Sequence, residues 1–278
     1  ERPGPEHRVQ FVIELVGPRS CPAVTAASLL DQQWHDALGK PQVFAMSPAD
    51  KDWQELTPRT DGSYDSIALA WDLAPDQGEL TSQAAAHLFQ VAESFGTHIQ
   101  RRAMPLPPPA DVNRYVAILR ELKDSLDIGV EILMVPRAAN FPERDVWIAL
   151  AELGYDLKPS GFFEIWAQGS TDPLVTVTPT GGQDAFALSS VERGVTHPGL
   201  LIGFSLPLSQ NPTYSLDAAY RTADHLCAKL NAAAFTDADQ MLGHSARNEL
   251  SSNLMAAVRT MVGAGIEPGS RAAKRLFS

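Results

Sequence analysis

The residues best suited to nucleophilic chemistry lie near the C-terminus, in the run Gly243-His244-Ser245. A serine flanked by glycines on a sharp turn, with a histidine as its base, is the nucleophile of many hydrolases. Arg247 stands where the second glycine of that motif is needed, and no long strand is expected before Gly243. We interpret Ser245 as the N-cap of a helix, where its hydroxyl accepts a hydrogen bond from a free backbone N–H. A Ser245 hydrolase is therefore kept only as a remote alternative.

Potential metal ligands are present, but their spacing does not suit a metal. Asp224, His225 and Cys227 fall on one predicted helix, which favours Cys227 in the core and the other two side chains in solvent. Asp237 and Asp239 resemble the start of a calcium loop whose glycine and final carboxylate are missing. We interpret both as turn carboxylates and expect no metal site.

Composition argues against several other classes of function. The chain has 278 residues, and 22 Lys and Arg against 33 Asp and Glu leave a net charge of −11. Both halves are acidic, so we expect no direct binding to nucleic acid or to an anionic membrane. Gly181-Gly182 precedes no lysine-bearing helix and predicts a hairpin turn, not a phosphate-binding loop. We therefore expect no cofactor and no enzymatic activity.

Hydrophobic periodicity predicts an α+β protein of two tandem modules. Residues 1–7 contain Pro3, Gly4 and Pro5 and predict a flexible leader. Residues 8–127 and 128–278 then share one order of elements: strand, helix, strands, helix, short strand and helix. In each module we expect an antiparallel sheet with helices on one face. The expected elements include a helix over 23–38 and second-module strands at 129–135, 161–166, 174–177, 185–191 and 200–206, with a short one near Ala234.

The second face of the second sheet is the candidate functional surface. Alternation along 200–206 points Leu200, Ile202 and Phe204 toward the helices, and it turns the residues between them outward. In strand 130–135 we expect Leu133 and Val135 inside. The expected outward set is Ile132, Met134, Phe162, Trp166, Ser189, Val191, Leu201, Gly203 and Ser205. So much apolar area usually marks an interface, either with a partner or with a second module or copy of the chain.

Several segments of the second half follow one another in a characteristic order. They are Val130–Val135, Ala151–Tyr155, Gly161–Phe163, Ala185–Leu188, Pro198–Pro207, Phe235–Asp237 and the closing Gly265–Ser270. In order and spacing, this series resembles the C-terminal FtsZ-binding domain of the ZipA family of bacterial cell-division proteins, in its longer, two-module form. The resemblance covers about half of the chain well, and residues 8–127 resemble a degenerate copy of the same module.

The resemblance implies a bare sheet face that grips the C-terminal tail of FtsZ through apolar contacts. It implies groove positions at or near Met134, Ser160, Ser189, Val191, Leu201, Gly203 and Ser205, with Pro136, Phe162 and Trp166 reshaping the groove. Gly203 stands where the family usually has an aromatic residue. The implied function is a non-enzymatic adaptor that tethers FtsZ to the cytoplasmic face of the inner membrane at the division site. A homotypic scaffold that uses the same face is the main alternative.

Overall fold

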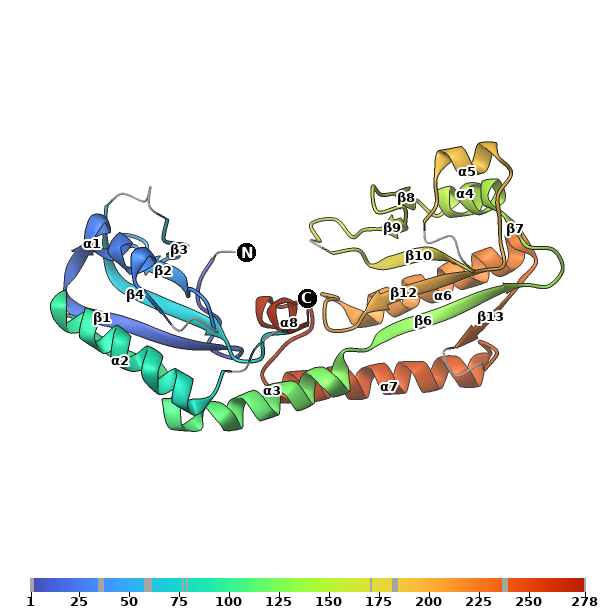
Figure 1. The fold of residues 1–278 in the computed structure, drawn as a ribbon. Coiled ribbons are helices and arrows are strands. Elements are labelled where there is room, and N and C mark those ends of the chain that lie inside the picture. Colours follow the sequence, from blue (N-terminus) through green and yellow to red (C-terminus); the bar gives the residue numbers. More distant parts are fainter. Residues whose placement is uncertain are drawn as a thin grey trace. The chain divides into compact units, whose positions relative to one another are not determined.

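The computed structural model describes residues 3–34, 38–57, 62–76, 78, 80–170, 172–181, 185–236 and 240–277. The chain divides into two compact units, Glu1–Asp124 and Ser125–Phe277, and the division falls within helix α3 (Val112–Leu126). The predicted module boundary between residues 127 and 128 lies close to this point. Each unit combines antiparallel strands with helices, so the predicted α+β class is confirmed (Figure 1).

The first unit is built on a five-stranded antiparallel sheet with the order β3-β2-β4-β1-β5. Its strands are β1 (Gln10–Pro22), β2 (Gln42–Met46), β3 (Trp53–Glu55), β4 (Ser63–Asp72) and β5 (Arg102–Leu106). Helix α2 (Ser82–His98) connects β4 to β5 and packs on one face, where Leu15 lies against Gly96. Thr81 caps α2, because its hydroxyl accepts a hydrogen bond from Ala84 N at 3.1 Å.

A buried arginine joins β1 to β4 where the register of the pair shifts between Val16 and Cys21. Arg101 Nη1 donates to the carbonyl oxygens of Leu15 and Asp65, both at 2.9 Å. Its Nη2 donates to two more carbonyl oxygens, those of Arg19 at 2.7 Å and Tyr64 at 3.0 Å. The side chain thus satisfies carbonyl groups that the irregular strand pair leaves without partners.

The described part of the N-terminal leader, residues 3–7, contains no helix or strand, and Gly4 within it packs on the first sheet. Gly4 is buried, and a Cβ atom there would lie 3.2 Å from Trp53 Cβ. Trp53 packs on a buried cluster formed by Val12, Phe44, Ala68 and Ala70. This cluster lies on the face opposite α2, since Val12 alternates with the residues beneath that helix. The N-terminal segment therefore helps to cover the second face of this sheet.

The predicted helix over 23–38 is much shorter in the structure. Helix α1 covers Ala23–Ala27, a 3₁₀ turn follows at Ser28–Asp31, and Gln32 is extended. Residues 35–37 lie outside the described part of the chain. The reason for the early end is packing: Trp34 is buried against Trp71 with their ring centroids 5.3 Å apart, which a continuing helix would not allow. A second 3₁₀ turn at Pro109–Asp111 leads into α3.

The second unit contains a six-stranded antiparallel sheet with the order β13-β6-β12-β10-β9-β8. Its strands are β6 (Gly129–Pro136), β8 (Asp156–Leu157), β9 (Phe163–Ile165), β10 (Val175–Thr180), β12 (Gly199–Ser205) and β13 (Ala232–Thr236). Strands β7 (Phe141–Pro142) and β11 (Thr196–His197) form a separate pair. The helices are α4 (Glu143–Glu152), α5 (Leu188–Glu192), α6 (Pro212–Leu230), α7 (His244–Gly263) and α8 (Arg271–Phe277).

One face of this sheet is covered by helices, as Figure 1 shows for α6 beneath β12 and β6. Ile132, Ile202 and Leu226 belong to one buried cluster together with α4 residues such as Val146. Helix α7 packs along α6, where Tyr220 donates its hydroxyl hydrogen to Arg247 O at 3.0 Å. Asn211 caps α6 by accepting from Tyr214 N at 3.1 Å, and Ser215 lies within the helix.

The two sheets share part of their topology. In each sheet a long central strand lies between two parallel strands joined by a helix: β1 between β4 and β5 with α2, and β6 between β12 and β13 with α6. The outer strands differ, because β2 precedes its neighbour β3 in the first unit, whereas β10 follows its neighbour β9 in the second, where β8 is the edge strand. β1 and β6 therefore occupy the same place in their sheets.

Candidate peptide-binding face

The face of the six-stranded sheet that points away from α4 and α6 is named here the outer face. In β6, Val130, Ile132 and Met134 are buried on the helical side, whereas Leu133 and Val135 are only partly buried on the other. In β12, Leu201 and Gly203 share that second side. The register of β6 and β12 places these outward residues opposite one another: Leu201 lies opposite Leu133, and Gly203 lies opposite Glu131.

A row of large apolar side chains crosses the outer face. Leu201 lies opposite Leu133, and Leu133 lies opposite Phe235 of β13. The row continues to Met241, which forms an isolated bridge with Phe235 and is 63% exposed. Directly opposed residues in antiparallel strands have their Cβ atoms about 5 Å apart, so these four side chains form a continuous apolar row. Leu133, Leu201 and Phe235 are partly exposed and Met241 largely so, which makes the row a partly exposed apolar patch.

An acidic row runs beside the apolar row, two residues earlier along β6. Glu131 is exposed, and across the sheet from it lie Gly203, Thr176 and Glu164 in succession. Gly203 forms the floor between the larger side chains, since a Cβ atom there would meet Val130 O at 3.0 Å. Glu164 Oε2 accepts a hydrogen bond from Trp166 Nε1 at 2.9 Å.

The structure brings some of the predicted groove residues together on this face. Leu201, Gly203 and Ser205 lie on β12 and alternate with its buried residues as expected. Phe162 and Trp166 flank β9, whose Phe163 is buried, so they also alternate to the outer side. Trp166 is 40% exposed.

The predicted outward orientation of Ile132 and Met134 is wrong. Both side chains are 0% exposed and lie in the core beneath α6, opposite Ile202 and Leu200. The error arose because every residue of 132–135 is apolar, so their pattern does not distinguish the two faces. The signal that decides it is Glu131, because an exposed carboxylate puts Leu133 and Val135 on the same side.

The predicted strand over 185–191 is also wrong, because helix α5 occupies residues 188–192. Ser189 and Val191 lie on this helix, which packs against α4 and not on the outer face. Ser160 is exposed in the turn before β9, and Pro136 ends β6 on the helical side of the alternation. The alternating pattern of 185–189 failed because a short amphipathic helix and a short strand cannot be told apart by periodicity alone.

Sequence reasoning missed the residues that dominate the outer face, namely Leu133, Val135, Phe235 and Met241. Phe235 was detectable as the large member of an otherwise small strand, Ala232–Thr236. Met241 had no local signal, because it joins the face only through backbone pairing. Thr236 N donates to Gln240 O and Leu242 N donates to Ala234 O, both at 2.8 Å. These bonds bring the chain after β13 back beside its edge.

A buried acid–histidine pair lies on the helical side. Glu143 and His197 are 0% and 1% exposed, with Glu143 Oε2 3.1 Å from His197 Nε2. Glu143 Oε1 also accepts from Trp147 Nε1 at 3.3 Å and from Ala187 N at 2.9 Å. The buried carboxylate therefore joins α4, β11 and the start of α5, which is a structural arrangement.

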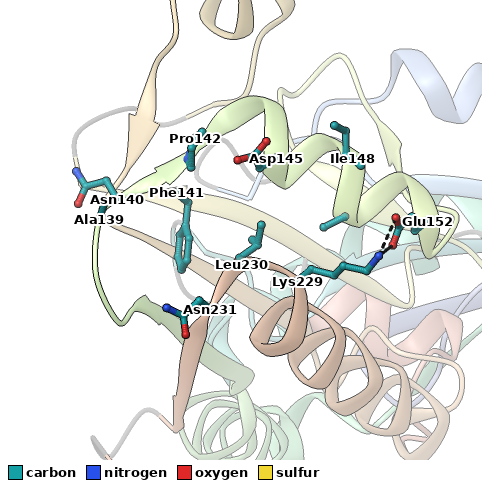
Figure 2. A pocket seen from close by; sticks show the side chains of 11 residues that line it. Ala139, Asn140, Phe141, Pro142, Asp145, Ile148, Glu152, Lys229, Leu230 and Asn231 are labelled. Carbon is teal, nitrogen blue, oxygen red and sulfur yellow. Dashed lines mark hydrogen bonds and ion pairs between the residues drawn. The ribbon is translucent and has the colours of Figure 1, made fainter.

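A surface cleft of ≈ 390 Å³ lies between the start of α4 and the end of α6 (Figure 2). Its wall includes Ile148, Asn231 and the ion pair of Lys229 with Glu152, whose Nζ and Oε2 atoms are 2.8 Å apart. The hydrogen bond from Lys229 holds the pKa of the Glu152 carboxyl below its usual range, and His225 adds to this effect. Lys229 and Glu152 are thus paired with each other, and Asp145 is the remaining charged residue of the lining.

The residues weighed for catalysis or metal binding that the structure describes are exposed or contact other side chains. His244 and Ser245 are both exposed in the first turn of α7, and Gly243, not Ser245, is its N-cap. Asp224 accepts from Arg247 Nη1 at 3.0 Å, and His225 Nε2 lies 3.1 Å from Glu152 Oε2.

The described ranges contain no group of three or more metal-ligating side chains. Asp237, Asp239 and Gly182 lie outside those ranges. Burial raises the pKa of the Cys21 and Cys227 thiols, which keeps them protonated at neutral pH.

Comparison of the chain with protein-family models gives no match, and comparison with curated proteins gives none either. Within the described part of the chain, no helix combines the length and the apolar character needed to cross a bilayer.

Proposed function

We propose that the second unit is an adaptor that binds a short, partly apolar peptide on its outer face. The observation that carries this proposal is the row Leu201, Leu133, Phe235 and Met241. This row crosses strands β12, β6 and β13 and the segment after β13, and it remains partly exposed. A peptide laid across it would bury several large side chains, each contributing of the order of 1 kcal/mol beyond its present burial. Met241 adds an adaptable side chain suited to an irregular partner surface.

The peptide that we propose is the C-terminal tail of FtsZ, which follows from the ordered segment resemblance to the ZipA family. The protein would then act without catalysis and tether FtsZ to the inner membrane at the division site, through an anchor outside this chain. The outer face supports the proposal because Leu201, Gly203 and Ser205, which the resemblance implies as groove residues, lie on it. Gly203 leaves a shallow floor in place of an aromatic side chain.

A titration of the whole chain with a fluorescently labelled FtsZ C-terminal peptide tests this function by anisotropy. We expect saturable binding that Leu201→Asp removes, because a carboxylate in the middle of the apolar row would have to lose its water on docking. Leu188→Asp is the matched control, since Leu188 is 63% exposed on α5, away from the outer face. Equal affinities of the two variants, or no binding of the unaltered chain, would refute the proposal.

The same apolar row also favours a second candidate function, self-association through the outer face. Exposed apolar patches pair with one another when no other partner is present. Sedimentation at increasing concentration distinguishes the two functions. A mass that rises with concentration and returns to that of a monomer in Leu201→Asp supports self-association, whereas a constant monomer mass rejects it.

A further inference from the structure

The acidic row on the outer face indicates the charge that a docked partner should carry. Glu131 and Glu164 are separated by the two strands β12 and β10, hence by three strand spacings or about 14 Å. Between them lie only Gly203 and Thr176. A docked side chain would therefore meet only small residues between the two carboxylates, beside the apolar row.

Glu131 lacks a counter-charge of its own. The residue is exposed, and within the part of the chain that the structure describes its carboxylate forms no hydrogen bond or ion pair. Near the other end of the acidic row, Lys158 lies 3.7 Å from Asp156 and over the ring of Trp166. Lys158 thus compensates Asp156, while Glu131 leaves an unbalanced negative charge next to Gly203.

The first unit shows how a chain segment docks on the corresponding face. Residues 3–7 cover part of the face of the first sheet that lies opposite α2, and the central strand there is β1, which has the place of β6. In that contact Glu6 N donates to Gln10 Oε1 at 2.9 Å, and His7 Nε2 lies 3.6 Å from Glu14 Oε1. Gln10 of this strand therefore accepts a hydrogen bond from the docked segment and Glu14 lies near its histidine, while apolar residues such as Val12 are buried beside them.

We propose that the segment that docks on the outer face of the second unit carries a lysine or arginine beside its apolar anchors, and that this cation lies between Glu131 and Glu164. The inference rests on the proposed function and adds the charge and the orientation of the bound peptide. Complementary charge sets the register of such a complex and speeds encounter, here in a chain with a net charge of −11. The apolar anchors then fall on Leu133 and Leu201, one step further along the strands.

The test compares charge variants of the whole chain in the anisotropy titration with the labelled FtsZ C-terminal peptide. We expect Glu131→Gln to weaken binding roughly two- to fivefold at low salt, the effect of one exposed ion pair. Glu131→Lys should weaken it about tenfold, because attraction becomes repulsion. Salt should weaken binding to the unaltered chain and have less effect on the Glu131→Gln, Glu164→Gln double variant. Glu249→Gln on the exposed surface of α7 is the matched control.

A second peptide, with every basic residue replaced by glutamine, completes the experiment. It should bind the unaltered chain and Glu131→Gln equally well. If the unaltered chain binds the original peptide and Glu131→Gln binds it as tightly at every salt concentration, the inference is wrong and the proposed function stands. If no peptide binds the unaltered chain, both fail. Sedimentation showing that a second copy covers the face would also overturn the inference.

Discussion

Leu133 and Leu201 lie directly opposite each other on the outer face, while their chain neighbours Ile132 and Ile202 form the next pair on the helical face. The first pair is partly exposed and the second is 0% exposed. One residue step along β6 therefore separates a position that meets a partner from a position that holds the core. This relationship allows binding and folding to be tested separately with two neighbouring substitutions.

Leu133→Asp and Ile132→Asp should have opposite consequences. Ile132→Asp buries a carboxylate without a partner, so we expect the second unit to lose several kcal/mol and to unfold at or near room temperature. Leu133→Asp should cost about 1 kcal/mol or less and abolish peptide binding. Circular dichroism melting and the anisotropy titration measure the two effects. A folded Ile132→Asp variant that no longer binds would show that the sheet faces have been assigned the wrong way round.

Arg101→Met should destabilise the first unit strongly. The substitution preserves much of the aliphatic volume but leaves four carbonyl oxygens without their donor, for which we expect a loss of about 3–5 kcal/mol. Arg102→Met, at the next and exposed position, should change the free energy of unfolding by less than about 0.5 kcal/mol. Urea denaturation of both variants provides the comparison, and similar midpoints would contradict the role of Arg101.

Glu143→Ala should loosen α5 and the β7–β11 pair. It removes the acceptor of Trp147 Nε1, Ala187 N and His197, and we expect a loss of about 2–4 kcal/mol. Asp145→Ala is the control, because Asp145 lies two residues away on the same helix and is exposed. Hydrogen exchange should show faster exchange in 187–197 for Glu143→Ala alone. Unchanged exchange there would mean that apolar packing, not the carboxylate, holds α5.

Tyr155 makes the second unit sensitive to alkali. Burial raises the pKa of its phenol from the ordinary value of 10.0 to about 12, and its hydroxyl oxygen lies 2.8 Å from Thr222 Oγ1. Because the folded pKa is higher than the unfolded one, its contribution is complete below pH 10 and is lost as the pH rises toward about 12.

We therefore expect Tyr155→Phe to lower the free energy of unfolding by about 1 kcal/mol at neutral pH. The variant should also lose less stability than the unaltered chain between pH 10 and about 12. Urea denaturation at a series of pH values measures it. An equally steep loss in the variant would assign the alkaline transition to other groups.

Trp53→Ala should release residues 3–7 from the first sheet. The indole lies between Gly4 and the buried cluster of Val12 and Phe44, so its removal should cost about 2–3 kcal/mol and expose the segment to proteolysis. Val24→Ala is the control, since Val24 is 86% exposed. Protease resistance of residues 3–7 in Trp53→Ala would show that other contacts hold the segment.

Long, strongly periodic segments were predictable from the sequence. Strands β6 and β12 lie close to the expected ranges 129–135 and 200–206, because a sustained apolar segment leaves few other arrangements. Short elements were not: residues 188–192 are helical because Ala187 N is bonded by Glu143, which lies 44 residues earlier in the sequence. The helix over 23–38 is short because Trp34 packs on Trp71 from β4.

The sequence by itself determined the α+β class, the alternation within β12 and therefore Leu201 and Gly203 as surface residues. Tertiary structure decided which side of β6 is buried, because that choice depends on pairing with β12 and β13 and not on the uniformly apolar residues of β6 itself. It also decided that Phe235 and Met241 complete the apolar row, and that residues 3–7 cover the first sheet. Contacts between residues far apart in the chain decide which face of a strand is buried, and the local hydrophobic pattern does not reveal these contacts.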